Sequence, residues 1–206
     1  THLSWICSVA AFVPYAIASG VTTVVTETLE PYPVAGIAGV LDLLASLQDQ
    51  PIRILATAPS MVSISTASRG ISPAALESLL AREEILAPGE SYWQAVLQEP
   101  DVYLPAYEQT LRAGKVLEGH SAGASEKKLA AYAAAGASSC HEPINAEQVL
   151  TRLRLGMHVM VREGSIRRDL EEISKIRELG LDLRRLILAS DGASPEDLVR
   201  RRYMDH

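Results

Sequence analysis

The sequence predicts a parallel α/β fold in which strands and crossover helices alternate, closed as a (β/α)8 TIM barrel. Two patterns and one absence lead to this prediction. Short apolar or β-branched runs recur along the chain, and each is followed by a loop and a stretch with helical spacing. The glycine-rich fingerprint that would favour an open dinucleotide-binding sheet is absent. Continuous apolar strands suit a parallel sheet covered by helices on both faces.

Seven runs are expected to form the strands, with Thr1-His2 as the stub of another. The runs are Val21–Thr26, Ile52–Ala58, Glu84–Ala87, Lys115–Glu118, Ala137–Cys140, His158–Val161 and Leu186–Ala189. They give strand–helix units of roughly 20–35 residues, the spacing of crossover units. No internal boundary is evident, so residues 1–206 are assigned to a single, partial barrel domain.

Start and stop signals mark the intervening helices. Ser72-Pro73 and Ser194-Pro195 each place a capping serine before a proline at the first helical position. Asn145 with Gln148 resembles a capping box, and Gly156 follows a helical stretch where a left-handed cap is needed. An apolar stripe at helical spacing is expected to face the core and consists of Val40, Leu43, Leu44 and Leu47.

Composition narrows the class of protein and its partners. Apolar residues make up 48% of the chain and charged residues 21%, which is typical of a globular protein. The net charge of −6 and the lack of a basic stripe interleaved with aromatics argue against nucleic-acid binding. Two cysteines, Cys7 and Cys140, cannot form a disulfide framework and fit a reduced, cytoplasmic setting. The apolar stretch Ile6–Ile17, broken by Pro14, is too short to span a membrane.

Five residues of the kinds that bind metals stand at equivalent places, at or just beyond the carboxyl end of an expected strand. In a barrel these ends converge on one face, so residues far apart in sequence can meet around one ion. Imidazole and carboxylate ligands suit Zn, Mn or Fe(II) better than Ca or Mg. The sequence therefore predicts a site for one or two divalent metal ions (Mn, Fe or Zn), formed by His2, Glu90, His120, His141 and Asp191.

Two of these residues are also expected to act in catalysis. A metal site of this kind supplies hydroxide at neutral pH, because the ion lowers the pKa of its bound water. Asp191 is predicted both to hold the metal and to carry a proton to a leaving amine. Glu90 is predicted to bridge two ions, which would make the centre binuclear.

Two other interpretations of these residues compete with the metal site. A histidine at a strand end is more often a hydrogen-bonded structural residue than a ligand, so the five could be scattered polar loop residues. The segment Gly119–Gly123 also matches the Gly-x-Ser-x-Gly nucleophile elbow, with Ser121 as nucleophile. That elbow requires an acid and then a histidine later in the chain. After Asp191 only His206 remains, which disfavours a serine nucleophile.

Several segments resemble a known enzyme family. Gly119–Gly123 and Ala135–Glu142 resemble the region of the fifth and sixth strands of microbial adenine deaminases. Arg154–Ser165 is similar to their seventh-strand segment, and Ala189–Asp191 followed by Pro195–Leu198 to their eighth strand and helix. The similarity covers nearly the whole chain and is most specific from residue 119 to residue 198.

The resemblance implies an amidohydrolase-type barrel whose relatives hydrolyse adenine to hypoxanthine and ammonia with divalent metals. The family's metal ligands fall by position on the five residues named above. The loop after the seventh strand would lie over a small purine-like substrate, and its substrate-binding residues would be Arg162, Glu163 and Ser165.

The chain departs from the family pattern at three positions of the site. Ser4 replaces the second histidine of the first-strand pair, Leu29 replaces a histidine after the second strand, and Gly192 replaces an aspartate after the eighth. The expected function is hydrolytic deamination of a purine, or of a related cyclic amidine or amide, by metal-activated water. The alternative is a catalytically impaired relative that serves as a small-molecule-binding or assembly module.

The length of 206 residues is short for a complete barrel, which typically needs about 250. The sequence therefore predicts a barrel incomplete at both ends, with an unpaired strand edge. Because such edges pair with other chains, we expect the chain to be unstable or to form homo-oligomers. Light scattering and thermal melting test this expectation, and a monodisperse monomer that melts cooperatively would contradict it.

Overall fold

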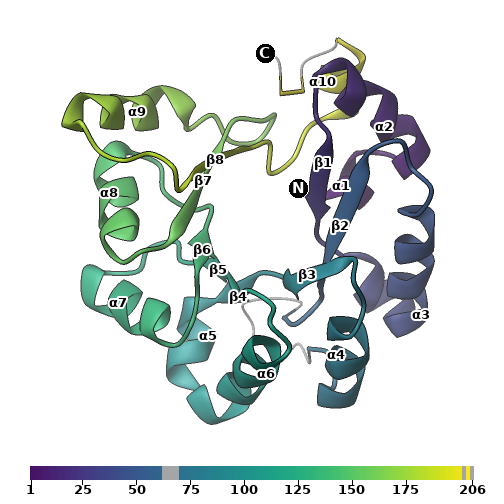
Figure 1. Ribbon diagram of the computed structural model, residues 1–206, viewed down its shortest axis with the longest axis horizontal. Helices are drawn as coiled ribbons and strands as arrows, with labels where there is room; N and C mark the ends of the chain where they lie inside the picture. Colours follow the sequence, from purple (N-terminus) through teal and green to yellow (C-terminus); the bar gives the residue numbers. More distant parts are fainter. Residues whose placement is uncertain (62–69, 201–202, 205–206) are drawn as a thin grey trace.

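The computed structural model describes residues 1–61, 70–200 and 203–204. Strands and helices alternate, and Figure 1 shows the strands around a central axis with the helices outside them. The strands are β1 (Thr23–Thr26), β2 (Arg53–Ala58), β3 (Ile85–Pro88), β4 (Ser91–Tyr92), β5 (Glu118–His120), β6 (Ser139–Cys140), β7 (His158–Arg162) and β8 (Leu186–Ala189). The helices are α1 (Leu3–Ile6), α2 (Val9–Ala18), α3 (Pro31–Ser46), α4 (Pro73–Leu80), α5 (Trp93–Gln98), α6 (Pro100–Arg112), α7 (Glu126–Ala134), α8 (Ala146–Arg154), α9 (Leu170–Ser174), the 3₁₀ helix η1 (Lys175–Leu179) and α10 (Pro195–Val199).

The strands form two parallel sheets. Strands β1, β2 and β3 are neighbours in the first, and β4 to β8 follow one another in the second. Val24 is paired with Ile54 in the first sheet, and Val159 with Leu186 in the second. Parallel pairing in chain order places the carboxyl ends of all these strands on one side of the molecule. The predicted α/β class with parallel strands is confirmed.

A closed barrel is not found in the described part of the chain, so the predicted TIM barrel, expected to be incomplete at both ends, is consistent with the two sheets but is not confirmed. The expected single strand at Glu84–Ala87 is followed by a second short strand, and the two belong to different sheets. The chain turns between them at Gly89 and Glu90. The amide of Gly89 donates to the carbonyl of Ala58, and a Cβ atom at position 89 would collide with the carboxylate of Glu27. Close packing against β2 thus ends the first sheet at this point.

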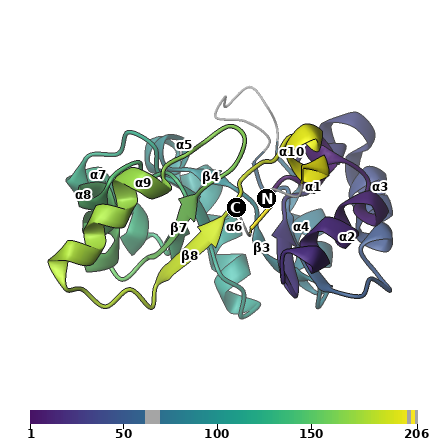
Figure 2. The same ribbon diagram turned by 90° about the horizontal axis from the view of Figure 1, so that it is seen from above.

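Thr1 lies between the other edges of the two sheets. Its backbone nitrogen donates to the carbonyl of Val25 over 3.0 Å, and its carbonyl accepts from the amide of Glu27 over 2.9 Å. The hydroxyl of Ser190, after β8, donates to the Thr1 hydroxyl over 3.3 Å. Figure 2 shows the start of the chain between the two halves of the molecule. One residue therefore connects the carboxyl ends of β1 and β8.

The predicted helix signals are confirmed. Ser72 accepts a hydrogen bond from the amide of Ala75, and Ser194 accepts one from the amide of Asp197. The side chain of Asn145 accepts from the amide of Gln148 over 3.0 Å. These bonds satisfy backbone donors that the first turn of a helix leaves free. The helices consequently begin where the sequence indicates.

The apolar stretch near the start of the chain forms α1 and α2, and α2 contains Pro14. Phe12 and Val13 are buried in α2, so the stretch packs into the core. Within residues 1–61, 70–200 and 203–204, no helix has both the length and the apolar character needed to cross a membrane.

The apolar stripe on α3 supports the first sheet. Val40 and Leu44 are fully buried and Leu47 nearly so, in a core cluster that also contains residues of β1, β2 and α4. Leu43 packs against this cluster from a partly buried position. The predicted orientation of α3 is therefore confirmed, and this packing supports the strands that lead to one side of the candidate site.

Replacing Leu44 by alanine should lower the free energy of unfolding by about 2–5 kcal/mol, because it leaves a cavity in close-packed surroundings. Leu41→Ala is the matched control on the same helix, since Leu41 is 41% exposed, and should cost less than about 1 kcal/mol. Urea denaturation followed by circular dichroism compares the two. Equal losses would show that α3 does not pack as described.

Candidate metal centre

All five predicted ligands lie at the carboxyl ends of the strands. His2 precedes α1 beside β1, Glu90 lies between β3 and β4, and His120 ends β5. His141 follows β6, and Asp191 follows β8. The structure therefore brings together residues that are up to 189 positions apart in the sequence.

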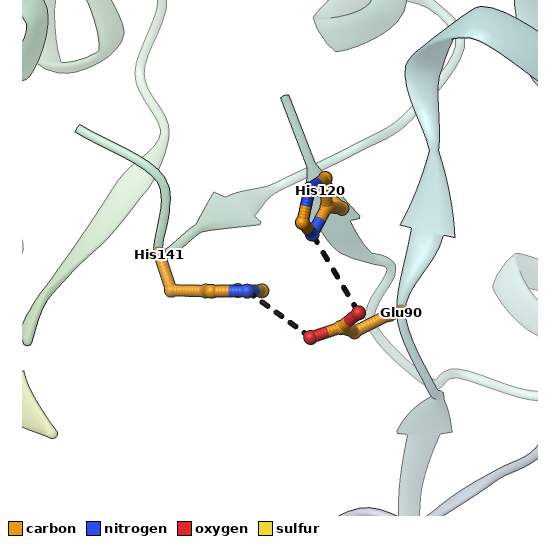
Figure 3. Close-up of side chains that lie close together, drawn as sticks. All are labelled: Glu90, His120 and His141. Atoms are coloured by element: carbon orange, nitrogen blue, oxygen red, sulfur yellow. Dashed lines mark ion pairs between the residues drawn. The ribbon is translucent and has the colours of Figure 1, made fainter. Parts of the chain in front are cut away.

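Glu90 is the centre of the first cluster. Figure 3 shows His120 and His141 with their rings directed toward its carboxylate. The Nδ1 atom of His120 lies 3.6 Å from Oε2 of Glu90, and the Nε2 atom of His141 lies 3.1 Å from Oε1. One potential ligand atom from each of these residues lies within 4.8 Å of the other two. That spacing suits three ligands around one ion.

Glu90 also belongs to a second cluster with His2 and Asp191. The Nε2 atom of His2 lies 3.8 Å from Oε1 of Glu90 and 3.8 Å from Oδ1 of Asp191. The potential ligand atoms of this trio also lie within 4.8 Å of one another. Glu90 is thus shared by two groups of potential ligands, the arrangement that the predicted bridging role requires.

The donor atoms of the two clusters are of the kinds that bind a divalent ion. The Nδ1 atom of His120 is buried and has no hydrogen-bond partner in the described structure, although it faces the Glu90 carboxylate. A buried polar atom without a partner is costly unless a ligand satisfies it. Two imidazoles with a carboxylate on one side, and one imidazole with two carboxylates on the other, are the donors that Zn, Mn and Fe(II) accept. The residues fit such an ion.

Burial and charge together shift the pKa values of the cluster. Burial alone would raise the pKa of Glu90, but the neighbouring histidines lower it well below its ordinary range. Burial alone would lower the pKa of His2, but Glu30 and Glu90 raise it to about 9. For His141, Glu118, Glu142 and Glu90 likewise outweigh burial, and its pKa is raised well above the ordinary value. Because a ligand imidazole must be neutral, metal binding at His2 and His141 would compete with their protonation.

Glu142 is a member of the cluster that the sequence analysis missed. Its Oε1 atom lies 3.1 Å from Nε2 of His141 and 3.5 Å from Nδ1 of His120. The same oxygen accepts a hydrogen bond from Arg162 over 2.9 Å. Burial opposes the shift, but His141, His120 and Arg162 lower the pKa of Glu142 to about 2. Glu142 directly follows the predicted ligand His141 in the sequence, and this position could have marked it as a residue of the site.

Arg162 occupies a buried position among three carboxylates. Its Nη1 atom lies 2.9 Å from Glu142 and 3.3 Å from Asp191, and its Nη2 atom lies 3.1 Å from Asp169. The guanidinium is only 3% exposed. In this geometry Arg162 orients two acids of the site. Its role in substrate binding stays a prediction.

The other two predicted substrate-binding residues lie beside a different, smaller hollow of about 60 Å³. Glu163 accepts a hydrogen bond from the amide of Leu170, and Ser165 contacts Asp197. Neither residue is among those that line the cavity at the metal centre. Their role in binding a substrate stays a prediction.

A cavity of about 430 Å³ opens at the cluster. Its polar lining includes His2, Glu90, His141 and Asp191, and its apolar lining includes Val25, Leu86, Met160 and Ile187. Cavities in this size range, mostly apolar with a few convergent polar groups, are typical of small-molecule sites.

The structure does not support the nucleophile elbow. Ser121 is fully buried, and its hydroxyl is held by Arg152 over 2.8 Å and by the Cys140 sulfur over 2.7 Å. An elbow serine must instead expose its oxygen to a substrate. His206, the only histidine after Asp191, lies outside the described residues.

Asp191 has an unusual backbone conformation. Its φ angle is 58°, in the left-handed region that few residues other than glycine adopt. Aspartate tolerates this region better than most residues, and such conformations gather at functional sites. The turn after β8 therefore directs the carboxylate toward His2 and Arg162.

Comparisons with known proteins place the chain next to one named group of enzymes. No protein-family model matches the chain. The adenine deaminase of Cenarchaeum symbiosum is 36% identical over the whole chain, that of Archaeoglobus fulgidus is 34% identical over the whole chain, and that of Moorella thermoacetica is 32% identical over 97% of it. The chain covers 34%, 37% and 35% of these proteins, so it spans about a third of their length.

A solved structure supports the fold. The beta-aspartyl dipeptidase of Fervidobacterium islandicum AW-1 superposes with a TM-score of 0.62 over 87% of this chain and 52% of its own, at 15% identity. Fold and site together define a parallel α/β protein with a histidine–carboxylate cluster suited to a divalent metal. More particularly, the chain is adenine-deaminase-like, and the resemblance inferred from its motifs is confirmed.

Glu27 is a further buried acid that lines the cavity. Thr57 donates to its Oε2 atom over 2.8 Å. Burial, together with the negative charge of Glu90, raises its pKa from 4.5 to about 7. The folded state thus holds this proton more tightly than the unfolded chain does. The resulting stability is present below about pH 4.5 and is lost as the pH rises through 7.

Glu27→Gln, which mimics the protonated acid, should therefore become more stable relative to the unsubstituted chain as the pH rises from 5 to 8. The change should be on the order of 1–3 kcal/mol. Urea denaturation of chelator-treated protein at both pH values measures it. Glu77→Gln is the control, because Glu77 lies exposed on α4. A pH response identical in all three proteins would contradict the assignment.

Proposed function

We propose that residues 1–206 form one metal-dependent hydrolase domain that deaminates a purine or a related cyclic amidine or amide. One observation carries the proposal: Glu90 is shared by two groups of potential metal ligands at the carboxyl ends of the strands. The similarity of the whole chain to part of several adenine deaminases supports the choice of substrate class.

The chain offers positions for one or two divalent ions, Mn, Fe or Zn. Glu90, His120 and His141 would hold one, and His2, Glu90 and Asp191 would hold the other. A bound ion would activate water at neutral pH. The cavity of about 430 Å³, which His2, Glu90, His141 and Asp191 help to line, would admit a planar purine-sized molecule.

In the reaction, one molecule of water replaces one amino group. A carbon–oxygen bond forms at the amidine carbon, and the bond from that carbon to the exocyclic nitrogen breaks. Asp191 lies at the cavity and would take a proton from the attacking water and pass it to the leaving nitrogen, which departs as ammonia. Arg162 contacts Oδ2 of Asp191 over 3.3 Å, while Oδ1 faces His2. The carboxylate is therefore already oriented.

The three departures from the family pattern bear on the competing hypothesis of an impaired relative. Ser4 donates to Glu30 over 3.0 Å, and Glu30 in turn contacts His2. The hydroxyl thus helps to hold a predicted ligand. The remaining ligands are brought together despite the substitutions at positions 4, 29 and 192. This favours an active enzyme over a binding-only protein.

The purified chain should contain a divalent metal and release ammonia from adenine, or from another member of a panel of purines, pyrimidines and cyclic amides. Asp191→Asn should lower kcat by about 10²- to 10⁴-fold, because it removes the proton carrier. Elemental analysis and a coupled ammonia assay provide the measurements.

Asp182→Asn serves as the control, because Asp182 is an exposed acid that contacts Arg184, and it should leave kcat unchanged. A folded chain without metal and without turnover on the whole panel would refute the proposal. Stabilisation by purines without metal, in the absence of turnover, would instead identify a binding-only relative.

A further inference from the structure

His141 uses its two ring nitrogens for different purposes. Nε2 faces the metal centre, 3.1 Å from the carboxylates of Glu90 and Glu142. Nδ1 faces away from these two acids and lies 2.8 Å from Oε1 of Glu118. The ring is buried, so these carboxylates rather than solvent determine its orientation.

Glu118 is itself held in place. It begins β5, its backbone is paired with Ser139 of β6, and the Ser139 hydroxyl donates to its Oε2 atom. Gly119, the next residue, packs so closely on Ser139 and Tyr132 that a Cβ atom there would collide with both. The strand pair therefore fixes the distance between the Glu118 carboxylate and the residue that follows β6.

A carboxylate on one nitrogen of an imidazole keeps the proton on that nitrogen. The other nitrogen then presents its lone pair, and the ring becomes a stronger ligand. With Glu118 on Nδ1, the lone pair of His141 would be at Nε2, the atom that faces Glu90. The same carboxylate also prevents the ring from flipping.

The arrangement is repeated at His2 in the other cluster. Nδ1 of His2 lies 2.5 Å from Oε1 of Glu30, while Nε2 faces Glu90 and Asp191. The second oxygen of Glu30 accepts from Ser4. In both pairs, an acid outside the ligand clusters holds Nδ1, and a serine holds that acid.

We propose that Glu118 and Glu30 are positioning residues that fix His141 and His2 with Nε2 directed to the metal centre. The inference rests on the proposed metal-dependent function. Glu118 and Glu30 would thus set the orientation and basicity of two metal ligands rather than act on the substrate.

The test uses Co²⁺ as a probe and measures its affinity for chelator-treated protein by absorbance and chelator competition. Glu118→Ala and Glu30→Ala should each lower the affinity about 10- to 100-fold and should alter the Co²⁺ absorption band. Glu118→Gln should lose less than Glu118→Ala, because its amide oxygen can still accept from Nδ1. Glu77→Ala, an exposed control on α4, should bind Co²⁺ as the unsubstituted chain does.

The outcomes separate this inference from the proposed function. If the unsubstituted chain binds no Co²⁺, the metal centre is refuted and the inference with it. If that chain binds Co²⁺ and Glu118→Ala and Glu30→Ala bind it equally well, only the inference fails. Should Glu118→Ala not fold, Ser139→Ala decides, because it removes only the hydroxyl that holds Glu118. A several-fold loss of affinity supports the inference, and an unchanged affinity overturns it.

Discussion

The structure of the site depends on how the negative charge of one buried carboxylate, that of Glu90, is balanced. Glu90 is only 9% exposed and lies among three imidazoles from different parts of the chain. A buried negative charge is tolerated only when positive or hydrogen-bonding groups surround it. His2 and His141, whose pKa values are raised, supply those groups. A bound ion would supply the same compensation.

The parallel sheets deliver these groups to one place. Each strand runs in the same direction, so the residues after β5, β6 and β8 emerge on the same side as Glu90. Two further acids, Glu118 and Glu30, contact the Nδ1 atoms of His141 and His2. The single guanidinium of Arg162 contacts three acids, which are Glu142, Asp169 and Asp191.

The sequence was sufficient to predict the parallel α/β class and the convergence of the five ligands, because both follow from strand direction and from residue types at strand ends. Glu118 could also have been predicted. It stands two residues before His120 in β5, and alternate residues of a strand share a face. It was missed because the strand was expected at Lys115–Glu118, whereas β5 runs from Glu118 to His120.

Other features depend on contacts that no local pattern encodes. The separation of β3 from β4 follows from the packing of Gly89 against β2 and the Glu27 side chain. The orientation of Arg162 depends on Asp169 and Asp191, which come from separate loops. Neither could be read from strand periodicity, because each results from tertiary packing.

Because the strands form two separate sheets, the predicted metal centre lies where it could hold the two sheets together. Glu90 stands at the junction between the three-stranded and the five-stranded sheet, and His2 lies beside the first. In the second sheet His120 ends β5, His141 follows β6 and Asp191 follows β8. An ion coordinated by His2 and Asp191 would link the two sheets at the edge where Thr1 hydrogen-bonds to both Val25 and Ser190. A bound metal would then stabilise the tertiary structure. Removing it with a chelator would make the chain more sensitive to proteases and would also abolish its activity.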